Sequence, residues 1–115
     1  MLTDISRMKV FLKLGVTDMR KSINTLGPLV EGTMRLPPMA ENLYVFCNRR
    51  KDIIKILYWD RNGFCLWQKR LEEDVFRWPA TQQEVMEIDR TELEWLLRGL
   101  DLTKAHKKLN FSSVI

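Results

Sequence analysis

The sequence is poor in the residues that mark secreted, zinc-binding or disordered proteins. Its 115 residues include two cysteines, one histidine, five glycines and four prolines. Two cysteines give neither a disulfide framework nor a zinc site, and so few glycines and prolines do not make a disordered chain. No apolar run is long enough to span a bilayer, and Lys9 and Lys13 interrupt the only N-terminal candidate for a signal peptide. We therefore expect a cytoplasmic protein without membrane contact.

The overall composition is that of an ordinary globular domain. Hydrophobic residues make up 45% of the chain and charged residues 30%, and a chain of this length suits one hydrophobic core. We expect a single α+β domain over residues 1–102 and a basic C-terminal tail over residues 103–115. The 19 Lys and Arg against 15 Asp and Glu leave a net charge of +4. This surplus favours a polyanionic partner, although many soluble proteins carry it without one.

The first third of the chain predicts a strand followed by a helix. Residues 8–14 alternate loosely between apolar and polar side chains, as a strand does. Thr17 then fits a helix N-cap, and Asp18 in the first turn complements the positive helix end. Pro28 should kink this helix or divide it after Gly27, because proline lacks an N–H group. The buried face of the helix is predicted to contain Ile23, Leu26 and Val30.

The middle of the chain predicts an antiparallel sheet. Four segments are rich in β-branched and aromatic residues, namely 43–48, 53–60, 64–71 and 75–78. Connections as short as those between them make an antiparallel meander rather than a parallel sheet with crossover helices. A further short strand is expected at 85–88. The predicted fold class is therefore α+β, an antiparallel meander sheet of five to six strands with two flanking helices.

The second flanking helix has a signal at each end. Asp89 is placed as its N-cap, and Glu92 three residues later completes a capping box. Gly99 stands where a left-handed residue ends a helix. The apolar face of this helix comprises Leu93, Leu96, Leu97 and Leu100.

The turns predict the register of the strands. With Asn62-Gly63 as a two-residue hairpin loop, Lys55 faces Arg70 on the next strand. With Glu73-Asp74 closing the following hairpin, Arg70 in turn faces Arg77. In the first hairpin, Arg50-Lys51 forms the loop, and the pairs are then Phe46 with Lys55 and Tyr44 with Leu57. A slip of one residue in any hairpin would move its side chains to the other face.

This register gives the sheet a predicted core face. It collects Val45, Cys47, Ile54, Ile56, Tyr58, Cys65, Trp67, Leu71, Phe76 and Trp78, and Lys69 is the one cation among them. We expect Ile56 and Trp67 to be nearly fully buried. Cys47 and Cys65 lie on strands that flank a third strand, which separates them too far for a disulfide.

The opposite face combines cations with aromatic side chains. It collects Tyr44, Phe46, Lys55, Leu57, Trp59, Leu66, Gln68, Arg70 and Arg77. Each directly opposed pair of like charges costs roughly 0.2–1 kcal/mol, so carboxylates, a partner or a bound polyanion should offset the row of three cations. Aromatic rings beside cations suit the bases and phosphates of nucleic acid. In the alternative interpretation a helix covers this face, the aromatic residues form a second core layer, and the cations are peripheral.

Catalysis finds no support in the sequence. The carboxylates next to predicted elements are Asp18, Asp60 and Glu92, and each is explained by a helix start, a turn or a cap. His106, the only histidine, lies in the predicted tail, so no Ser/His or Cys/His pair is evident. There is no glycine-rich phosphate loop. We expect a protein that is not an enzyme and that uses no cofactor or metal.

Three segments of the chain are distinctive, namely GVTDMRK at residues 15–21, LYVFCNRRKDIIKILYWDRNGFCLWQKRLEEDVFRWP at residues 43–79, and LLRGLDL at residues 96–102. Together they resemble the small accessory protein of the insertion-sequence sixty-six transposon family. The family motif corresponds here to Asp18, Met19, Arg20, Lys21, Lys55, Trp59, Asp60, Gly63, Trp67, Lys69, Arg70 and Leu71. The chain departs from the family at Cys47-Asn48, where Arg-Gly is frequent, and at Pro28, where a helix former is usual.

The resemblance implies an accessory protein of bacterial transposition that works beside an element-encoded transposase and a second small accessory protein. It implies no catalytic residue. The leading hypothesis is direct DNA contact that helps assemble the transposase–DNA complex, through Arg20, Lys21, Arg49, Arg50, Lys51, Lys55, Trp59, Arg70 and Arg77. The alternatives are a protein–protein adaptor for the transposase without DNA contact and, more remotely, a metal-dependent nuclease.

Overall fold

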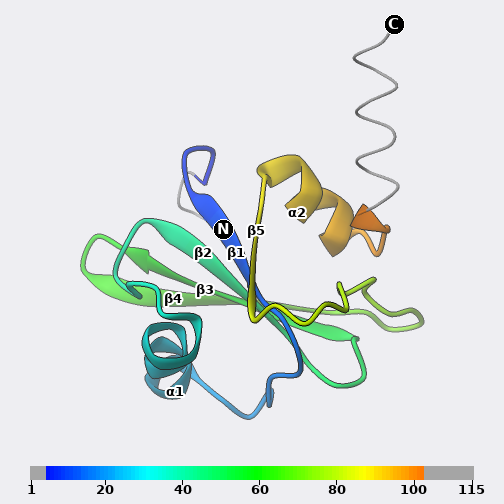
Figure 1. The fold of residues 1–115 in the computed structure, drawn as a ribbon, viewed down its shortest axis with the longest axis horizontal. Helices are drawn as coiled ribbons and strands as arrows, with labels where there is room; N and C mark the ends of the chain where they lie inside the picture. The colour runs from blue at the N-terminus through cyan, green and yellow to red at the C-terminus, as the bar shows by residue number, and fades with distance from the viewer. Residues whose placement is uncertain (1–4, 103–115) are drawn as a thin grey trace, which may run out of the picture.

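The fold is one five-stranded sheet with a helical layer on each face (Figure 1). The computed structural model describes residues 5–102, so the tail predicted at 103–115, with His106, lies outside the described residues. The strands are β1 (Lys9–Lys13), β2 (Asn42–Cys47), β3 (Ile53–Asp60), β4 (Gly63–Arg70) and β5 (Val85–Ile88). The helices are α1 (Ile23–Leu29), the π-helix η1 (Val30–Met34) and α2 (Arg90–Leu97).

The sheet is mixed, with the order β4-β3-β2-β1-β5, and the prediction of a purely antiparallel sheet is wrong. The pair β1–β2 is parallel, whereas β2–β3, β3–β4 and β1–β5 are antiparallel. Two parallel strands need a long crossover between them, and α1 and η1 supply it here. The short turns correctly indicated the meander of β2, β3 and β4. They carried no information on the partner of β1, since no short turn joins β1 to its neighbours.

Residues 75–78 do not form the predicted strand. The whole connection from 71 to 84 contains neither helix nor strand. Phe76 donates its backbone N–H to the carbonyl of Lys51 at 2.6 Å, and Trp78 donates to Phe76 at 2.9 Å. The side chains of Phe76 and Trp78 are nevertheless buried in the core. The apolar residues of this segment therefore predicted its burial correctly. The segment does not pair with β4, however, so Arg77 does not lie opposite Arg70.

The register of the first hairpin is confirmed and that of the second is corrected. Phe46 pairs with Lys55 as predicted. In the second hairpin the two-residue loop is Arg61-Asn62, with Arg61 at φ 54°, so Lys55 pairs with Gln68 instead of Arg70. Moving the loop by one residue shifts each partner by two positions, and two positions is the side-chain period of a strand. The assignment of residues to faces therefore survives the wrong register.

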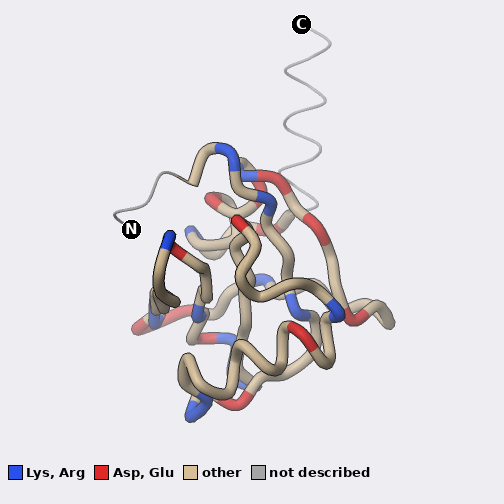
Figure 2. The backbone as a smooth tube through the Cα atoms, turned by 90° about the vertical axis from the view of Figure 1, so that its left-hand side faces the viewer, with Lys and Arg blue, Asp and Glu red and all other residues tan. Residues whose placement is uncertain are grey.

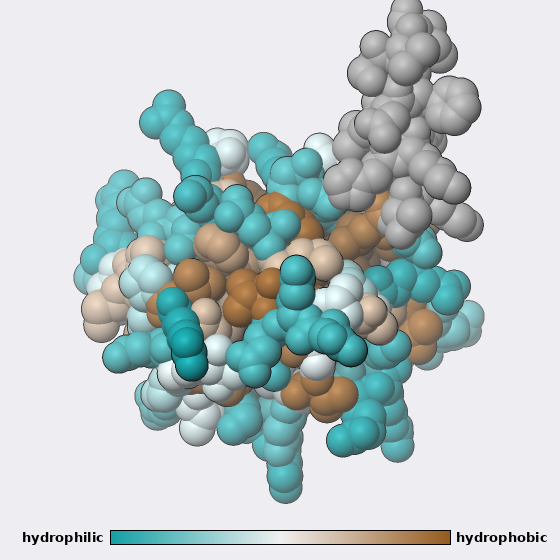
Figure 3. All heavy atoms as spheres, in the orientation of Figure 1, coloured by the Kyte–Doolittle hydropathy of each residue, from teal (hydrophilic) through white to brown (hydrophobic). Residues whose placement is uncertain are grey.

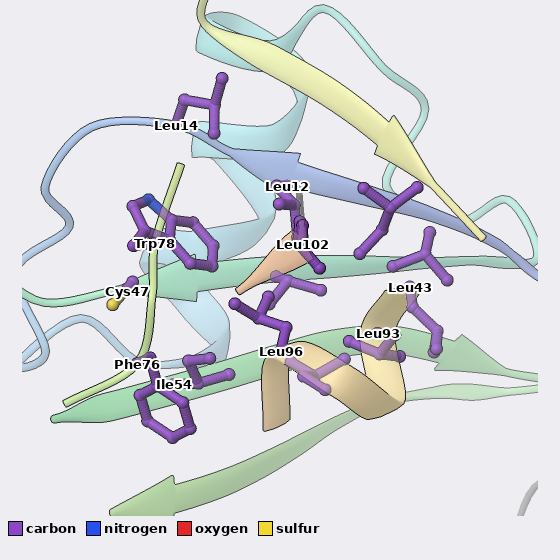
Figure 4. Close-up of a cluster of buried hydrophobic side chains, with 14 of the residues drawn as sticks. Leu12, Leu14, Leu43, Cys47, Ile54, Phe76, Trp78, Leu93, Leu96 and Leu102 are labelled. Carbon is purple, nitrogen blue, oxygen red and sulfur yellow. The ribbon is translucent and has the colours of Figure 1, made fainter. Parts of the chain in front are cut away.

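The first core cluster fills the space between the sheet and α2 (Figure 4). All ten residues of the predicted core face belong to it or pack against it. Ile56 is fully buried, but Trp67 is only partly buried because β4 is an edge strand. Lys69, the cation on this face, donates from Nζ to the carbonyl of Leu97 at 2.8 Å. It thereby satisfies a free carbonyl at the C-terminus of α2.

A second core cluster lies between the other face of the sheet and the crossover helices. Tyr44, Phe46 and Leu57 are fully buried there. They pack in one cluster with Leu26 and Val30 of the crossover, which confirms the helical face predicted for that segment. The interpretation in which a helix covers the aromatic face is thus correct. These aromatic rings form core structure and are not available for stacking on bases.

The helix predicted to begin at Thr17 starts five residues later, at Ser22. Thr17 does not cap it, because its backbone N–H donates to the carbonyl of Cys47 at 2.9 Å and ties the segment to β2. Ser22 is the N-cap and donates its N–H to Thr25 Oγ1 at 2.9 Å. Pro28 neither ends nor divides the helix after Gly27. The chain passes from α1 into η1 at Val30, two residues after the missing N–H group.

The start and end of α2 agree with the sequence analysis. Asp89 accepts the backbone N–H of Glu92 at 2.7 Å, and Glu92 Oε1 accepts the backbone N–H of Asp89 at 3.0 Å. Gly99 has a φ of 80°, the left-handed value expected after the helix. The capping box is therefore confirmed.

The two cysteines are free, as the strand order requires. Cys47 lies on β2 and Cys65 on β4, with β3 between them. Burial raises the pKa of the Cys47 thiol to about 12, so it stays protonated and unreactive at neutral pH.

The surface seen in Figure 3 is largely hydrophilic, with small apolar areas between charged and polar residues. Within residues 5–102, no helix has both the length and the apolar character needed to cross a bilayer.

The capping box gives a first prediction. Asp89→Ala should lower the free energy of unfolding by about 1 kcal/mol, because the backbone N–H of Glu92 at the start of α2 loses its acceptor. Urea denaturation followed by circular dichroism measures this loss. Glu94→Gln, which breaks only the exposed ion pair with Arg90 within α2 and leaves the cap intact, is the matched control and should change stability by less than about 0.5 kcal/mol. Equal stability of both variants would show that the cap is energetically silent.

Candidate nucleic-acid interface

Chain topology gathers most of the predicted contact residues at one end of the sheet. Strands β1, β2 and β4 finish there, and β3 and β5 begin there, as the pairing of Lys13 with Val85 and of Ile53 with Arg70 shows. The segment after β1, the β2–β3 loop and the segment after β4 therefore lie at this end (Figure 1). We call it the basic end, and the predicted contact residues that lie there are Arg20, Lys21, Arg49, Arg50, Lys51, Arg70 and Arg77.

The positive charge is concentrated in two of these three segments. The segment after β1 and the β2–β3 loop carry five cations, Arg20, Lys21, Arg49, Arg50 and Lys51, against two carboxylates, Asp18 and Asp52. Beside them, Arg70 lies 3.4 Å from Glu72, and the segment that leads to Arg77 carries two further acidic residues. From the side shown in Figure 2, which is the left-hand side of Figure 1, basic and acidic positions are interspersed along the backbone.

Lys55 does not belong to an exposed surface. Its side chain is buried, and Nζ donates to the carbonyl of Met19 at 2.7 Å and to that of Lys21 at 2.9 Å. The charge is thus stabilised by two backbone carbonyls of the segment after β1. Lys55 acts as an anchor that holds this segment against the sheet.

The segment that Lys55 holds is a tight turn closed by Asp18. Lys21 donates its N–H to the carbonyl of Asp18 at 3.1 Å, and the N–H of Arg20 donates to Asp18 Oδ1 at 2.9 Å. The guanidinium of Arg20 also binds the same carboxylate, with Nη2 2.7 Å and Nε 3.0 Å from Oδ2. The hydrogen bond from this side chain is the main reason why the pKa of Asp18 is lowered to about 2. Asp18 is therefore a turn residue and not a helix-start charge.

The β2–β3 loop is fixed by Asn48. Its Oδ1 accepts the backbone N–H groups of Asp52 and Ile53, both at 3.0 Å, and its Nδ2 donates to Asp52 Oδ1 at 2.7 Å. Lys51 has a φ of 61° and donates its N–H to the carbonyl of Asn48 at 3.1 Å. An Asn in this position holds a turn through its side chain. The three successive cations of this loop consequently point out from a rigid base.

The two basic segments line one hollow of about 570 Å³. The hydrogen bond from Thr17 to Cys47 brings them together, although they are about thirty residues apart in the chain. The hollow is lined by Val16, Thr17, Asp18, Met19, Arg20, Asn48, Arg49 and Arg50. Such a concave site with exposed guanidinium groups suits an anion such as phosphate.

The predicted row of Lys55, Arg70 and Arg77 does not exist. Lys55 lies opposite Gln68 and is buried, and Arg77 belongs to a segment without a strand. The arrangement that replaces it is the pair of basic segments around the hollow.

Trp59 lies at the other end of the sheet. It pairs with Phe64 next to the β3–β4 turn, and the two rings pack edge to face with centroids 5.0 Å apart. It is therefore remote from the basic end.

Sequence reasoning did not identify Thr17 or Asn48 as parts of the site. The sequence could have indicated the role of Asn48, because Asn before a short polar loop often holds a turn through its side chain. No feature of the sequence indicates the role of Thr17.

Among the described residues, no three His, Cys, Asp or Glu side chains cluster closely enough to hold a metal ion. Of the carboxylates considered in the sequence, Asp18 binds Arg20 and Glu92 caps α2.

The anchor formed by Lys55 gives a second prediction. Lys55→Met keeps the length of the side chain but leaves the carbonyls of Met19 and Lys21 without their donor. We expect a loss of about 1–3 kcal/mol in the free energy of unfolding, measured by urea denaturation. Lys9→Met, at an exposed position of β1, is the control and should cost less than about 0.5 kcal/mol. If the two variants are equally stable, the buried ammonium does not hold the turn.

The Asp18–Arg20 pair gives a third prediction. The pKa of Asp18 is lowered from 3.8 to about 2, so the charged carboxylate is favoured in the folded chain. The pair therefore stabilises the fold fully above pH 3.8, and this contribution is lost as the pH falls through about 2. Titration of the Asp18 carboxyl by NMR should show a midpoint near 2, and Arg20→Gln should return it toward 3.8. A midpoint that Arg20→Gln leaves unchanged would assign the shift to another cause.

Comparison with known proteins gives consistent results. Residues 8–107 match the family described as IS66 Orf2 like protein. Two curated relatives come from Sinorhizobium fredii, and both carry the name of an uncharacterized protein. The first, y4hO, is 34% identical over 101 residues, which is 88% of each chain. The second, y4jC, is 28% identical over 101 residues, which is 88% of this chain and 86% of the relative. No solved structure matches the chain significantly. With the family match covering most of its length, this chain belongs to the family of IS66 Orf2 like proteins.

Proposed function

We propose that this chain is a non-catalytic accessory protein of IS66-type transposition that contacts DNA directly through its basic end. Family membership supports the role in transposition. The observation that carries DNA contact is the convergence of Arg20, Arg49 and Arg50 on one hollow, with Lys21 and Lys51 in the same two segments. Arg70 and Arg77 border this site, whereas Lys55 is buried and Trp59 is remote, so neither of the last two belongs to the proposed interface.

The proposal rests on two physical properties of the basic end, its positive charge and the rigidity of its turns. Phosphate contacts supply most of the sequence-independent affinity for DNA, because they release condensed counterions. Arginine is especially suited to them, since its planar guanidinium binds two phosphate oxygens at once. Here the arginines extend from turns that Asp18 and Asn48 hold in place by hydrogen bonds. Less conformational freedom of the backbone is therefore lost on binding.

The proposed partners are the element-encoded transposase and a second small accessory protein, in the bacterial cytoplasm. In this arrangement the chain helps to assemble the transposase–DNA complex and leaves the chemistry of strand transfer to the transposase.

A protein–protein adaptor without DNA contact is the second candidate, and a specific surface favours it. An apolar hollow of about 500 Å³ lies over the crossover helices, next to the exposed side chain of Met39. Its other walls include Pro28, Pro38 and Phe64. Exposed apolar hollows are frequent sites of protein contact. Co-purification with the transposase from nuclease-treated lysate would favour this candidate, and failure to co-purify would count against it.

The fourth prediction tests DNA contact directly. The double variant Arg49→Gln/Arg50→Gln should weaken binding to element-end DNA on any sequence alike. The log–log slope of affinity against salt should flatten by about two units, at about 0.9 per phosphate contact on duplex DNA. Fluorescence anisotropy over a range of salt concentrations measures both quantities.

The matched control for this experiment is Arg7→Gln/Arg90→Gln, which removes the same charge from exposed positions at the other end of the sheet. It should leave most of the slope intact. If both double variants lose the same affinity, net charge rather than the basic end governs binding. If the parent chain binds no DNA even at low salt, direct DNA contact is excluded and the adaptor remains.

A further inference from the structure

Two further hollows adjoin the hollow between the two basic segments at this end of the sheet. A second hollow, of about 430 Å³, shares Val16 and Asn48 with it and adds Lys51 and Trp78. A third, of about 590 Å³, shares Lys51 and Trp78 with the second and adds Arg77. Because neighbouring hollows share wall residues, they lie side by side along this end of the sheet, and we call the three together the end groove.

Two residues that line the end groove each carry a buried polar atom without a hydrogen bond. Among the described residues, Thr17 Oγ1 and Trp78 Nε1 are buried side-chain atoms with no hydrogen bond. The two side chains are 3% and 7% exposed. Thr17 lines the first hollow, and Trp78 lines the second and third. Buried polar groups in native proteins are nearly always paired, so these two atoms indicate that a ligand or water completes the site.

The chemistry of these two atoms, together with the cations above them, specifies the ligand. An indole N–H only donates, and a threonine hydroxyl can donate as well. Both groups therefore suit ligand oxygens that accept a hydrogen bond. The cations that line the first two hollows favour oxygens that carry a negative charge. Asp18, the one carboxylate that lines the first two hollows, is already paired with Arg20, whereas both Glu92 and Asp101 line the third hollow. Phosphate groups are thus favoured in the first two hollows.

Trp78 Nε1 is itself buried, so a ligand oxygen reaches it only if a wall of the groove moves. In Figure 4 the nitrogen of Trp78 lies on the ring edge turned away from Leu96 and Phe76. Residues 79–82 form a wall of the second hollow and have neither helix nor strand. Such a wall can shift by a small amount at low cost, which opens the N–H group to a ligand oxygen.

We propose that the end groove binds the backbone of a single-stranded DNA segment, with one phosphate in the first hollow and the next in the second. This inference rests on the proposed function, since it specifies the form of DNA that the basic end takes. A duplex presents its phosphates on a stiff, convex surface and cannot bring them to these buried atoms. A single strand can lay its backbone along a narrow basic groove. Thr17 and Trp78 then add hydrogen bonds that a duplex contacting only the exposed arginines lacks.

The fifth prediction uses the full chain and three DNA probes of one sequence, namely a single-stranded 12-mer, its blunt duplex and a duplex with a single-stranded overhang. The single strand and the overhang should bind about tenfold more tightly than the blunt duplex at equal salt, as expected for one or two charge-assisted hydrogen bonds. The chain has four tryptophans, so ¹⁵N-labelled protein gives four indole N–H signals. The Trp78 signal should move on titration with the single strand, and the Trp59 signal should not.

Two pairs of variants separate the role of these two buried atoms from folding. Trp78→Phe removes the N–H but keeps a ring in the core, and Trp67→Phe is the matched control in the same core cluster. Trp78→Phe should lose about tenfold in single-strand affinity and keep its duplex affinity, whereas Trp67→Phe should keep both. Thr17→Val should act in the same direction, and Thr17→Ser, which retains the hydroxyl, should not.

The outcomes also distinguish this inference from the proposed function. If all probes bind equally and Trp78→Phe binds like the parent, the groove inference is wrong while DNA contact stands. If no probe binds at low salt, the proposed function fails and this inference fails with it. If Trp78→Phe does not fold, the Thr17 pair and the indole signals of the parent chain decide the question.

Discussion

The parallel pairing of β1 with β2 is the constraint on which the rest of the structure depends. Two parallel strands finish at the same end of the sheet, so the chain has to cross the whole sheet before β2 can begin. That crossing supplies α1 and η1, which cover one face and bury Tyr44 and Phe46. It also places the segment after β1 beside the β2–β3 loop. The second core and the basic end therefore have the same topological origin.

The buried ammonium of Lys55 makes that arrangement specific. A charged group is costly to bury unless polar partners surround it, and two backbone carbonyls meet this requirement here. Both carbonyls belong to the turn that Asp18 closes. Residues 18–21 and Lys55 are thus partners in one structural unit. This unit fixes where Arg20 lies and leaves its guanidinium exposed.

Charge at the basic end is informative because of its distribution. A net charge of +4 is unremarkable for a chain of 115 residues. Five cations in two adjoining turns, with two carboxylates that are themselves hydrogen-bonded within those turns, create a local surplus. At Arg70 and Arg77 the neighbouring acidic residues remove most of such a surplus. The end groove runs from the two basic turns toward Arg77 and its acidic neighbours. One end of it is therefore basic, and the other end carries charges of both signs.

Local signals in the sequence determined the features that depend on neighbours in the chain. The capping box at Asp89, the left-handed Gly99 and the meander of β2, β3 and β4 follow from side chains a few residues apart. The face of each strand residue also followed, because the side-chain period of two tolerates the misplaced turn at Arg61. Only the tertiary structure decided which strand β1 joins, why Lys55 is buried, and that Arg20 and Arg49 line one hollow. These features depend on contacts between residues far apart in the chain, and no periodicity, turn or cap in a single segment encodes such a contact.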